Sequence, residues 1–175
     1  MALWYLMRAT GAAALVLLSL TMVMGIVNVR RWAPRGVPRF LVDDLHRTSA
    51  LLVIALLVIH IVTAAVDKFV AISLLNVLVP FSAGWKPLWV GLGALSLECL
   101  AALIVTSLLR ARFGLRAWRA VHWLAYACWP LALVHALGTG TDVAAGWMLW
   151  LAIGCAAAVG AAIAVRVAQR PEPAR

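Results

Sequence analysis

The chain has 175 residues, of which 66% are hydrophobic and 12% are charged, and its mean hydropathy is +1.02. A chain this apolar cannot cover itself with polar surface, so the composition excludes a water-soluble globular domain and indicates an integral membrane protein. The formal net charge of +9 does not indicate nucleic-acid binding, because the basic residues follow the connections between apolar segments, as membrane topology dictates.

Five segments are long enough to cross a hydrocarbon core about 30 Å thick, which takes about 20 apolar residues. We expect these helices at about 11–29, 45–66, 87–109, 117–137 and 145–165, within a single transmembrane domain that covers residues 1–175. A shorter apolar stretch at 70–81 carries Pro80 near its end and is expected to be interfacial or re-entrant. The predicted fold class is therefore all-α, a polytopic membrane bundle of five transmembrane helices.

The first segment follows Arg8, as the apolar part of a cleaved signal peptide would follow its positive charge. Its apolar run is longer than the roughly 7 to 15 residues usual in signal peptides. Cleavage near Gly25 would also leave the arginines that follow on the translocated side, against the positive-inside rule. We therefore interpret the segment as the first transmembrane helix.

Most basic residues lie in the first connection, the third connection and the tail. They are Arg30, Arg31, Arg35, Arg39, Arg47, Arg110, Arg112, Arg116, Arg119, Arg166, Arg170 and Arg175. Because positive residues accumulate on the cytoplasmic side, this pattern predicts an amino terminus outside and a carboxyl terminus inside. We expect a multi-pass protein of the cell membrane, in contact with the lipid bilayer and not with nucleic acid.

The four histidines of the chain fall as two pairs in the second and fourth segments. His60 follows His46 by two heptads, and His135 follows His122 by one position fewer. At about 1.5 Å of rise per residue, each pair spans about 20 Å along its helix. Because the second and fourth segments run in the same direction, His46 and His122 share the cytoplasmic half, and His60 and His135 share the outer half.

Two imidazoles at each level suit the two axial positions of a haem iron. Zinc takes three or four protein ligands, so the histidines alone do not make a zinc site. Cys99, Cys128 and Cys155 form no C-x-x-C or C-x-x-C-H motif, so we expect packing residues, no disulfide framework and no thioether-linked haem. The alternative is that the histidines are unrelated core residues that form hydrogen bonds between helices.

The angular positions of the histidines agree with this hypothesis in only one helix. The two-heptad step from His46 to His60 places both on one helix face, whereas the shorter step from His122 to His135 is displaced by roughly 100°. Pro130 lies between His122 and His135 and could kink the helix enough to redirect His135. It could equally be an ordinary transmembrane proline.

Glu98 lies near the middle of the third segment, where a carboxylate is costly unless it is protonated, paired or hydrated. Two interpretations stay open. Glu98 could relay a proton that accompanies an electron, or it could be a protonated structural residue bound to a neighbouring helix.

The double histidine pair resembles the ferric reductase-like transmembrane domain family, which includes ferric reductases, NADPH oxidases and the haem-binding membrane subunit of methionine sulfoxide reductase systems. The resemblance lies in the segments LHR at 45–47, VIH at 58–60, VHW at 121–123 and VHALGTGTD at 134–142. It implies two non-covalent b-type haems that pass electrons from the cytoplasm outward. By the same resemblance, His46 and His122 would hold the inner haem, and His60 and His135 the outer haem.

Many members of this family continue into a flavin and nicotinamide domain, and we expect no flavin or NAD site in this chain because no G-x-G-x-x-G follows a strand pattern. The electron donor is then expected to be a separate cytoplasmic flavoprotein, a quinol or another reductase. The arginines of the first and third connections would offer it a docking face.

Haem propionates require cationic or hydrogen-bonding partners near each membrane face. Arg47 and Arg119 are the inner candidates, although topology alone also explains both arginines. The weaker outer candidates are Lys68, Lys86, Thr139 and Thr141.

The sequence therefore predicts the membrane haem subunit of an oxidoreductase, which needs a separate reductase partner. Ferric iron, oxygen, a quinone or an oxidised outer protein could each be its acceptor. The alternative is a non-redox role as a haem-binding sensor or as an assembly subunit of a membrane complex.

Overall fold

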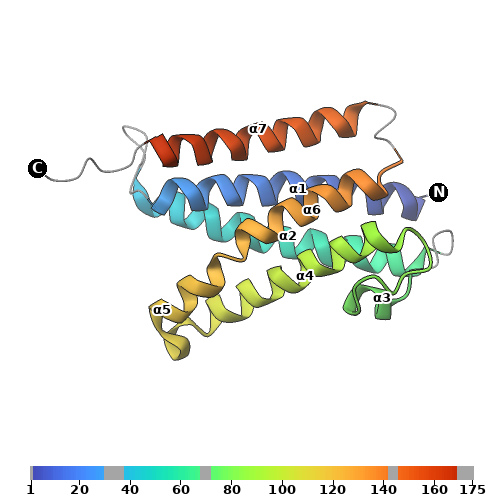
Figure 1. The fold of residues 1–175 in the computed structure, drawn as a ribbon, viewed down its shortest axis with the longest axis horizontal. Helices are drawn as coiled ribbons and strands as arrows, with labels where there is room; N and C mark the ends of the chain where they lie inside the picture. The colour runs from blue at the N-terminus through green and yellow to red at the C-terminus, as the bar shows by residue number, and fades with distance from the viewer. Residues whose placement is uncertain (1, 30–37, 68–71, 142–145, 169–175) are drawn as a thin grey trace, which may run out of the picture.

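The computed structural model describes residues 2–29, 38–67, 72–141 and 146–168, and all regular structure in these residues is helical. Figure 1 shows the helices lying side by side, mostly along the long axis of the molecule. In chain order they are α1 (Ala2–Val29), α2 (Arg39–Val66), α3 (Leu74–Leu78), α4 (Pro87–Leu108), α5 (Arg110–His122), α6 (Ala125–Thr139) and α7 (Trp147–Ala168). The predicted all-α class is confirmed.

Four of these helices, α1, α2, α4 and α7, are each long and apolar enough to cross a membrane. The fifth predicted span corresponds to the pair α5 and α6, which meet at an angle of 46° and pass the same test only when taken together. The described part of the chain thus has four membrane-length helices, or five if the bent pair is one span.

Some helices begin at residues other than those expected, because apolar composition does not mark where a helix starts. Helix α1 begins at Ala2 and α2 begins at Arg39, each earlier than predicted, since helices continue through interfacial polar residues. Pro38 precedes α2 in an extended conformation (φ −63°, ψ 138°) and marks its start. The stretch expected at 70–81 contains only the short helix α3, and its residues 70 and 71 lie outside the described residues.

The third connection is a helix, which the sequence analysis did not predict. Residues 110–116, expected as a loop, belong to the amphipathic helix α5, because arginine, alanine and leucine are good helix formers. Gly114 interrupts α5 with φ 77° and ψ 162°, a conformation that strains any residue with a Cβ. Helix α6 continues through Pro130, and the bend between α5 and α6 lies earlier, at Trp123 and Leu124.

Helix α1 holds the bundle together. It packs along α2, and its other faces contact α6 and α7, whereas α4 packs against α6. Leu15, Met148 and Cys155 form one buried apolar cluster, and Met22, Ile26 and Val159 form a second. Large apolar side chains also cover the outside of the helices, as expected for a surface that faces lipid.

The helix ends lie in two groups, at opposite ends of the molecule. The end of α1, the start of α2, helix α5 and the end of α7 lie together at one end, and α3 lies at the other (Figure 1). The end that contains α5 carries Arg47 and the four arginines of α5. We call it the basic end. The described arginines are grouped as the topology prediction requires, and the side of the membrane that they face stays a prediction. Arg30, Arg31, Arg35, Arg170 and Arg175 lie outside the described residues.

Candidate functional site

The four histidines occupy two levels of the bundle. His46 lies near the start of α2 and His122 ends α5, close to the basic end, whereas His60 lies towards the end of α2 and His135 lies within α6. All four side chains are half-buried. The order along α2 and along the bent pair α5 and α6 is thus the one that the sequence predicts.

His60 and His135 face each other across the bundle. Their ring centroids are 6.5 Å apart and their planes are nearly perpendicular, at 89°. With metal–nitrogen bonds of about 2 Å, two imidazoles that share one iron have ring centroids about 6.3 Å apart. The spacing of this outer pair therefore fits the two axial ligands of one haem.

The inner pair is less completely defined. His122 lies within electrostatic range of His46, and its ring packs at 4.8 Å between centroids against Trp118. The Nδ1 atom of His122 is buried and has no hydrogen-bond partner among the described residues. This orphaned nitrogen sets His122 apart from the other three histidines.

The other three imidazoles are each anchored by a backbone carbonyl of a neighbouring helix. Nδ1 of His46 lies 3.0 Å from the Thr21 oxygen, and Nδ1 of His60 lies 2.8 Å from the Met7 oxygen, both on α1. Nδ1 of His135 lies 2.8 Å from the oxygen of Trp89 on α4. Because a carbonyl oxygen only accepts, Nδ1 must carry the proton, which leaves the Nε2 lone pair available to a metal.

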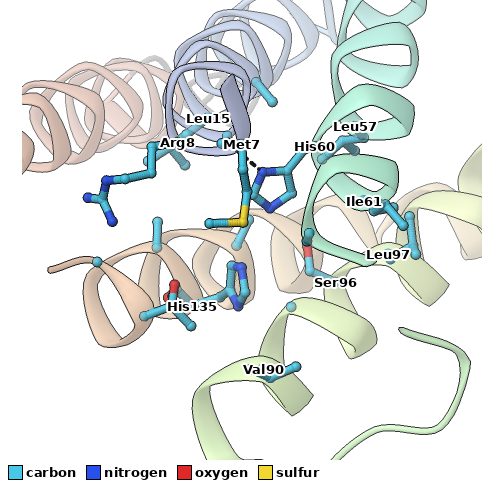
Figure 2. Close-up of a pocket in the computed structure, with 18 of the residues that line it drawn as sticks. Met7, Arg8, Leu15, Leu57, His60, Ile61, Val90, Ser96, Leu97 and His135 are labelled. Carbon is cyan, nitrogen blue, oxygen red and sulfur yellow. Dashed lines mark hydrogen bonds between the residues drawn. The ribbon is translucent and has the colours of Figure 1, made fainter. Parts of the chain in front are cut away.

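A mainly apolar cavity surrounds the outer pair (Figure 2). Helices α2 and α6, which carry His60 and His135, lack the extensive backbone packing that joins α1 to α2 and α4 to α6. Val53 lies midway between the two histidines of α2, and Cys128 lies one heptad before His135. Both side chains are buried and line the cavity, so apolar groups separate the two histidine levels.

The residues expected to bind the propionates of an outer haem have different surroundings. The ammonium of Lys86 donates to the carbonyl of Gly138 at 2.8 Å, whereas Thr139 and Thr141 line the cavity. Lys68 lies outside the described residues. Arg8 also lines the cavity, a role that its position just before the first apolar segment did not predict.

Arg47 and Arg119, the inner propionate candidates, are both exposed at the basic end. Neither belongs to the cavity around the outer histidine pair. Their positions close to His46 and His122 in the chain keep them near the inner level, so their proposed contact with propionates stays a prediction.

Glu98 lies apart from the residues that line the cavity of the outer histidine pair. Its side chain is exposed at the middle of α4 and is absent from the residues that line the cavity. An exposed carboxylate at the middle of a membrane-length helix lies at the depth where a charge is most costly.

The cysteines lie within helices, with Cys128 and Cys155 buried, and all three are free thiols. Among the described residues, no cluster of three or more His, Cys, Asp and Glu side chains could hold a metal ion. Two imidazoles per level are nevertheless the ligand set that a haem needs, because the porphyrin supplies the other four nitrogens.

Comparison with protein families gives one match. Residues 10–133 match the family described as ferric reductase like transmembrane component, which is well over half of the chain. The match contains His46, His60 and His122 and ends just before His135. Neither the curated proteins nor the solved structures give a match. The chain is therefore a multi-pass integral membrane protein that belongs to the ferric reductase like transmembrane component family.

Proposed function

We propose that this chain binds two haems b and conducts electrons across the membrane, as the membrane subunit of a ferric reductase-like oxidoreductase. Domains of its family generally bind haem, which supports the choice of cofactor. The observation that carries the proposal is the pair His60 and His135, whose centroids lie 6.5 Å apart beside an apolar cavity. His46 and His122 form the second pair.

Three of the histidines already hold their proton on Nδ1, so Nε2 can bind a metal without a change of tautomer. In His46, His60 and His135 the Nδ1–H group is engaged by a carbonyl, so the free lone pair lies on Nε2. Each bound haem would take up and release one electron at a time. The lining around the outer pair is mainly apolar, which would limit the contact of a bound haem with water.

The distance between the two histidine levels would let an electron cross the membrane in two steps, first to one haem and then to the other. His46 and His60 lie two heptads apart on one helix, which corresponds to about 20 Å along the axis. Val53 lies midway between them on α2, and its side chain is buried. Two sites stacked in this way would span most of a hydrocarbon core about 30 Å thick.

The proposed direction runs from the basic end to the opposite end. Helix α5 exposes Arg110, Arg112, Arg116 and Arg119, which would attract an acidic cytoplasmic flavoprotein or stabilise the docking of another reductase. A membrane quinol is the alternative donor. With the basic end in the cytoplasm, the amino terminus lies outside, and electrons leave at the level of His60 and His135.

Reconstitution into sealed vesicles tests the conduit. Ferricyanide is trapped inside, and a membrane-impermeant reductant is added outside to vesicles that contain the full chain. We expect internal ferricyanide to be reduced by vesicles with the native chain, and not by vesicles with His60→Ala or His46→Ala.

The controls are the matched variant Gly154→Ala, which lies on α7 where a new Cβ meets nothing within 4 Å, and vesicles without protein. A chain that binds haem but transfers no electrons across the membrane would support the non-redox sensor instead. A chain that binds no haem would leave only the assembly role.

A further inference from the structure

Each carbonyl that anchors a histidine occurs at the same place relative to a glycine. In all three cases the glycine is the fourth residue after the carbonyl in the same helix. The pairs are Met7 with Gly11, Thr21 with Gly25, and Trp89 with Gly93. The repeat is not a product of one helix contact, because two pairs are on α1 facing α2 and the third is on α4 facing α6.

The spacing has a simple geometric cause. In an α-helix the carbonyl of residue n points along the axis towards the amide of residue n+4, so the Cβ of residue n+4 crowds that oxygen. A glycine at n+4 removes this Cβ and opens the side of the oxygen to a second donor. The imidazole can then approach and share the carbonyl with the helical amide.

The imidazoles occupy the space that the missing Cβ atoms leave. A Cβ on Gly93 would lie 2.5 Å from Nδ1 of His135, and one on Gly11 would lie 2.9 Å from Nδ1 of His60. A Cβ on Gly25 would lie 3.3 Å from Cε1 of His46. The first two separations are impossible without movement of the ring, and the third requires a small displacement.

His122 is the one histidine of the four that has no such glycine and carbonyl facing it among the described residues. Counting 13 residues forward from Gly93 along α4, the same step that separates His122 from His135, reaches Thr106 and not a glycine. The hydroxyl of Thr106 donates to the carbonyl of Ala102 at 2.7 Å, four residues earlier. Thr106 also carries the Cβ that Gly11, Gly25 and Gly93 lack, and Nδ1 of His122 has no hydrogen-bond partner among the described residues.

We propose that Gly11, Gly25 and Gly93 are positioning residues for the haem ligands. Each glycine exposes one carbonyl, which holds the Nδ1–H group of the facing histidine and fixes both the proton and the plane of its ring. A hydrogen bond from Nδ1 makes Nε2 a stronger donor to iron, which stabilises the ferric state and lowers the midpoint potential. The effect on the iron rests on the proposed function, whereas the effect on the protonation of the rings does not.

The test uses the full chain in lipid nanodiscs with ¹⁵N-labelled histidine. Gly11→Ala, Gly25→Ala and Gly93→Ala are compared with Gly154→Ala, which meets nothing within 4 Å. Two quantities are measured: the ¹⁵N signals of the imidazole Nδ1–H groups, and the midpoint potential of each haem. Signals are assigned by replacing one histidine at a time.

We expect hydrogen-bonded Nδ1–H signals for His46, His60 and His135 and not for His122. Each glycine variant shifts the signal of its own histidine and raises the midpoint potential of the haem at that level. The order of the shifts follows the clashes, with Gly93→Ala largest and Gly25→Ala smallest. Gly154→Ala leaves both signals and potentials unchanged.

The proposal is wrong if variants with two bound haems keep the native Nδ1–H signals and potentials. If Gly93→Ala fails to accumulate, Gly25→Ala decides, because its predicted clash is mild. A native chain without haem overturns the proposed function, and its Nδ1–H signals still decide whether the carbonyls position the rings. The two failures are therefore distinguishable.

Discussion

The imidazole planes of His60 and His135 stand at 89° to each other, with 6.5 Å between their centroids. Each ring is fixed separately, since Nδ1 of His60 binds the Met7 carbonyl on α1 and Nδ1 of His135 binds the Trp89 carbonyl on α4. The perpendicular arrangement thus results from two different helix contacts. It gives the outer level a spectroscopic property that can be measured.

When the two imidazoles bound to a haem iron are perpendicular, the two iron orbitals that interact with their π systems are nearly equal in energy. A ferric low-spin haem then gives an electron paramagnetic resonance signal with a large maximum g value. We expect this signal from the outer haem of the oxidised chain, and we expect it to disappear in His135→Ala. The inner haem, measured in the same variant, is the control. A native spectrum with only the rhombic signal of parallel imidazoles would contradict the observed ring geometry.

The arginines of α5 are expected to control the rate of reduction and not the binding of haem. Changing Arg112, Arg116 and Arg119 together to Glu reverses the charge of an exposed helix, so an acidic donor should reduce the chain about 10-fold more slowly or worse at low salt. The difference should shrink as ionic strength rises. Stopped-flow reduction measures the rate, and an unchanged haem spectrum shows that the fold is intact. Equal rates for both chains would exclude α5 as the docking face.

Glu98→Gln is expected to leave electron transfer unchanged. Glu98 is exposed on α4 and does not line the cavity of the outer histidines, so a neutral isostere should alter neither the haem spectrum nor the vesicle transfer rate across neutral pH. The measurement is ferricyanide reduction at several pH values. A slower and pH-shifted rate in the variant would instead support the proton relay.

The proposed orientation is open to a labelling test. With the native cysteines replaced, Arg112→Cys on α5 should react with an impermeant maleimide only from the cytoplasmic side. Ser82→Cys, which follows α3 at the opposite end, should react only from outside. The reverse pattern would overturn the orientation and, with it, the proposed direction of electron flow.

Sequence reasoning was sufficient for the parts of the fold that depend on solvent. Apolar segments as long as 87–108 reveal themselves by hydropathy alone, because a bilayer admits little else. Hydropathy does not reveal α5, because its arginines are equally typical of a loop at the membrane surface. Pro130 predicts a possible bend at its own position, whereas the break lies at Trp123 and Leu124.

Part of the candidate site can likewise be predicted from the sequence, and part cannot. The histidine levels follow from counting residues along two co-directional helices, so sequence was enough to pair His60 with His135. The carbonyls that anchor the rings depend on the register between helices, which spacing within one helix does not determine. Gly11 and Gly25 are separated by the same two heptads as His46 and His60, and this match was a signal that sequence analysis could have used.

The most direct measurement of the central claim is the number of haems per chain in purified protein, by pyridine haemochrome absorbance against protein concentration. The account predicts two haems b in the native chain and the loss of one haem in each single replacement of His46, His60, His122 or His135 by Ala. Gly154→Ala should retain both. A native chain with no haem, or single histidine variants that keep two, would contradict the account.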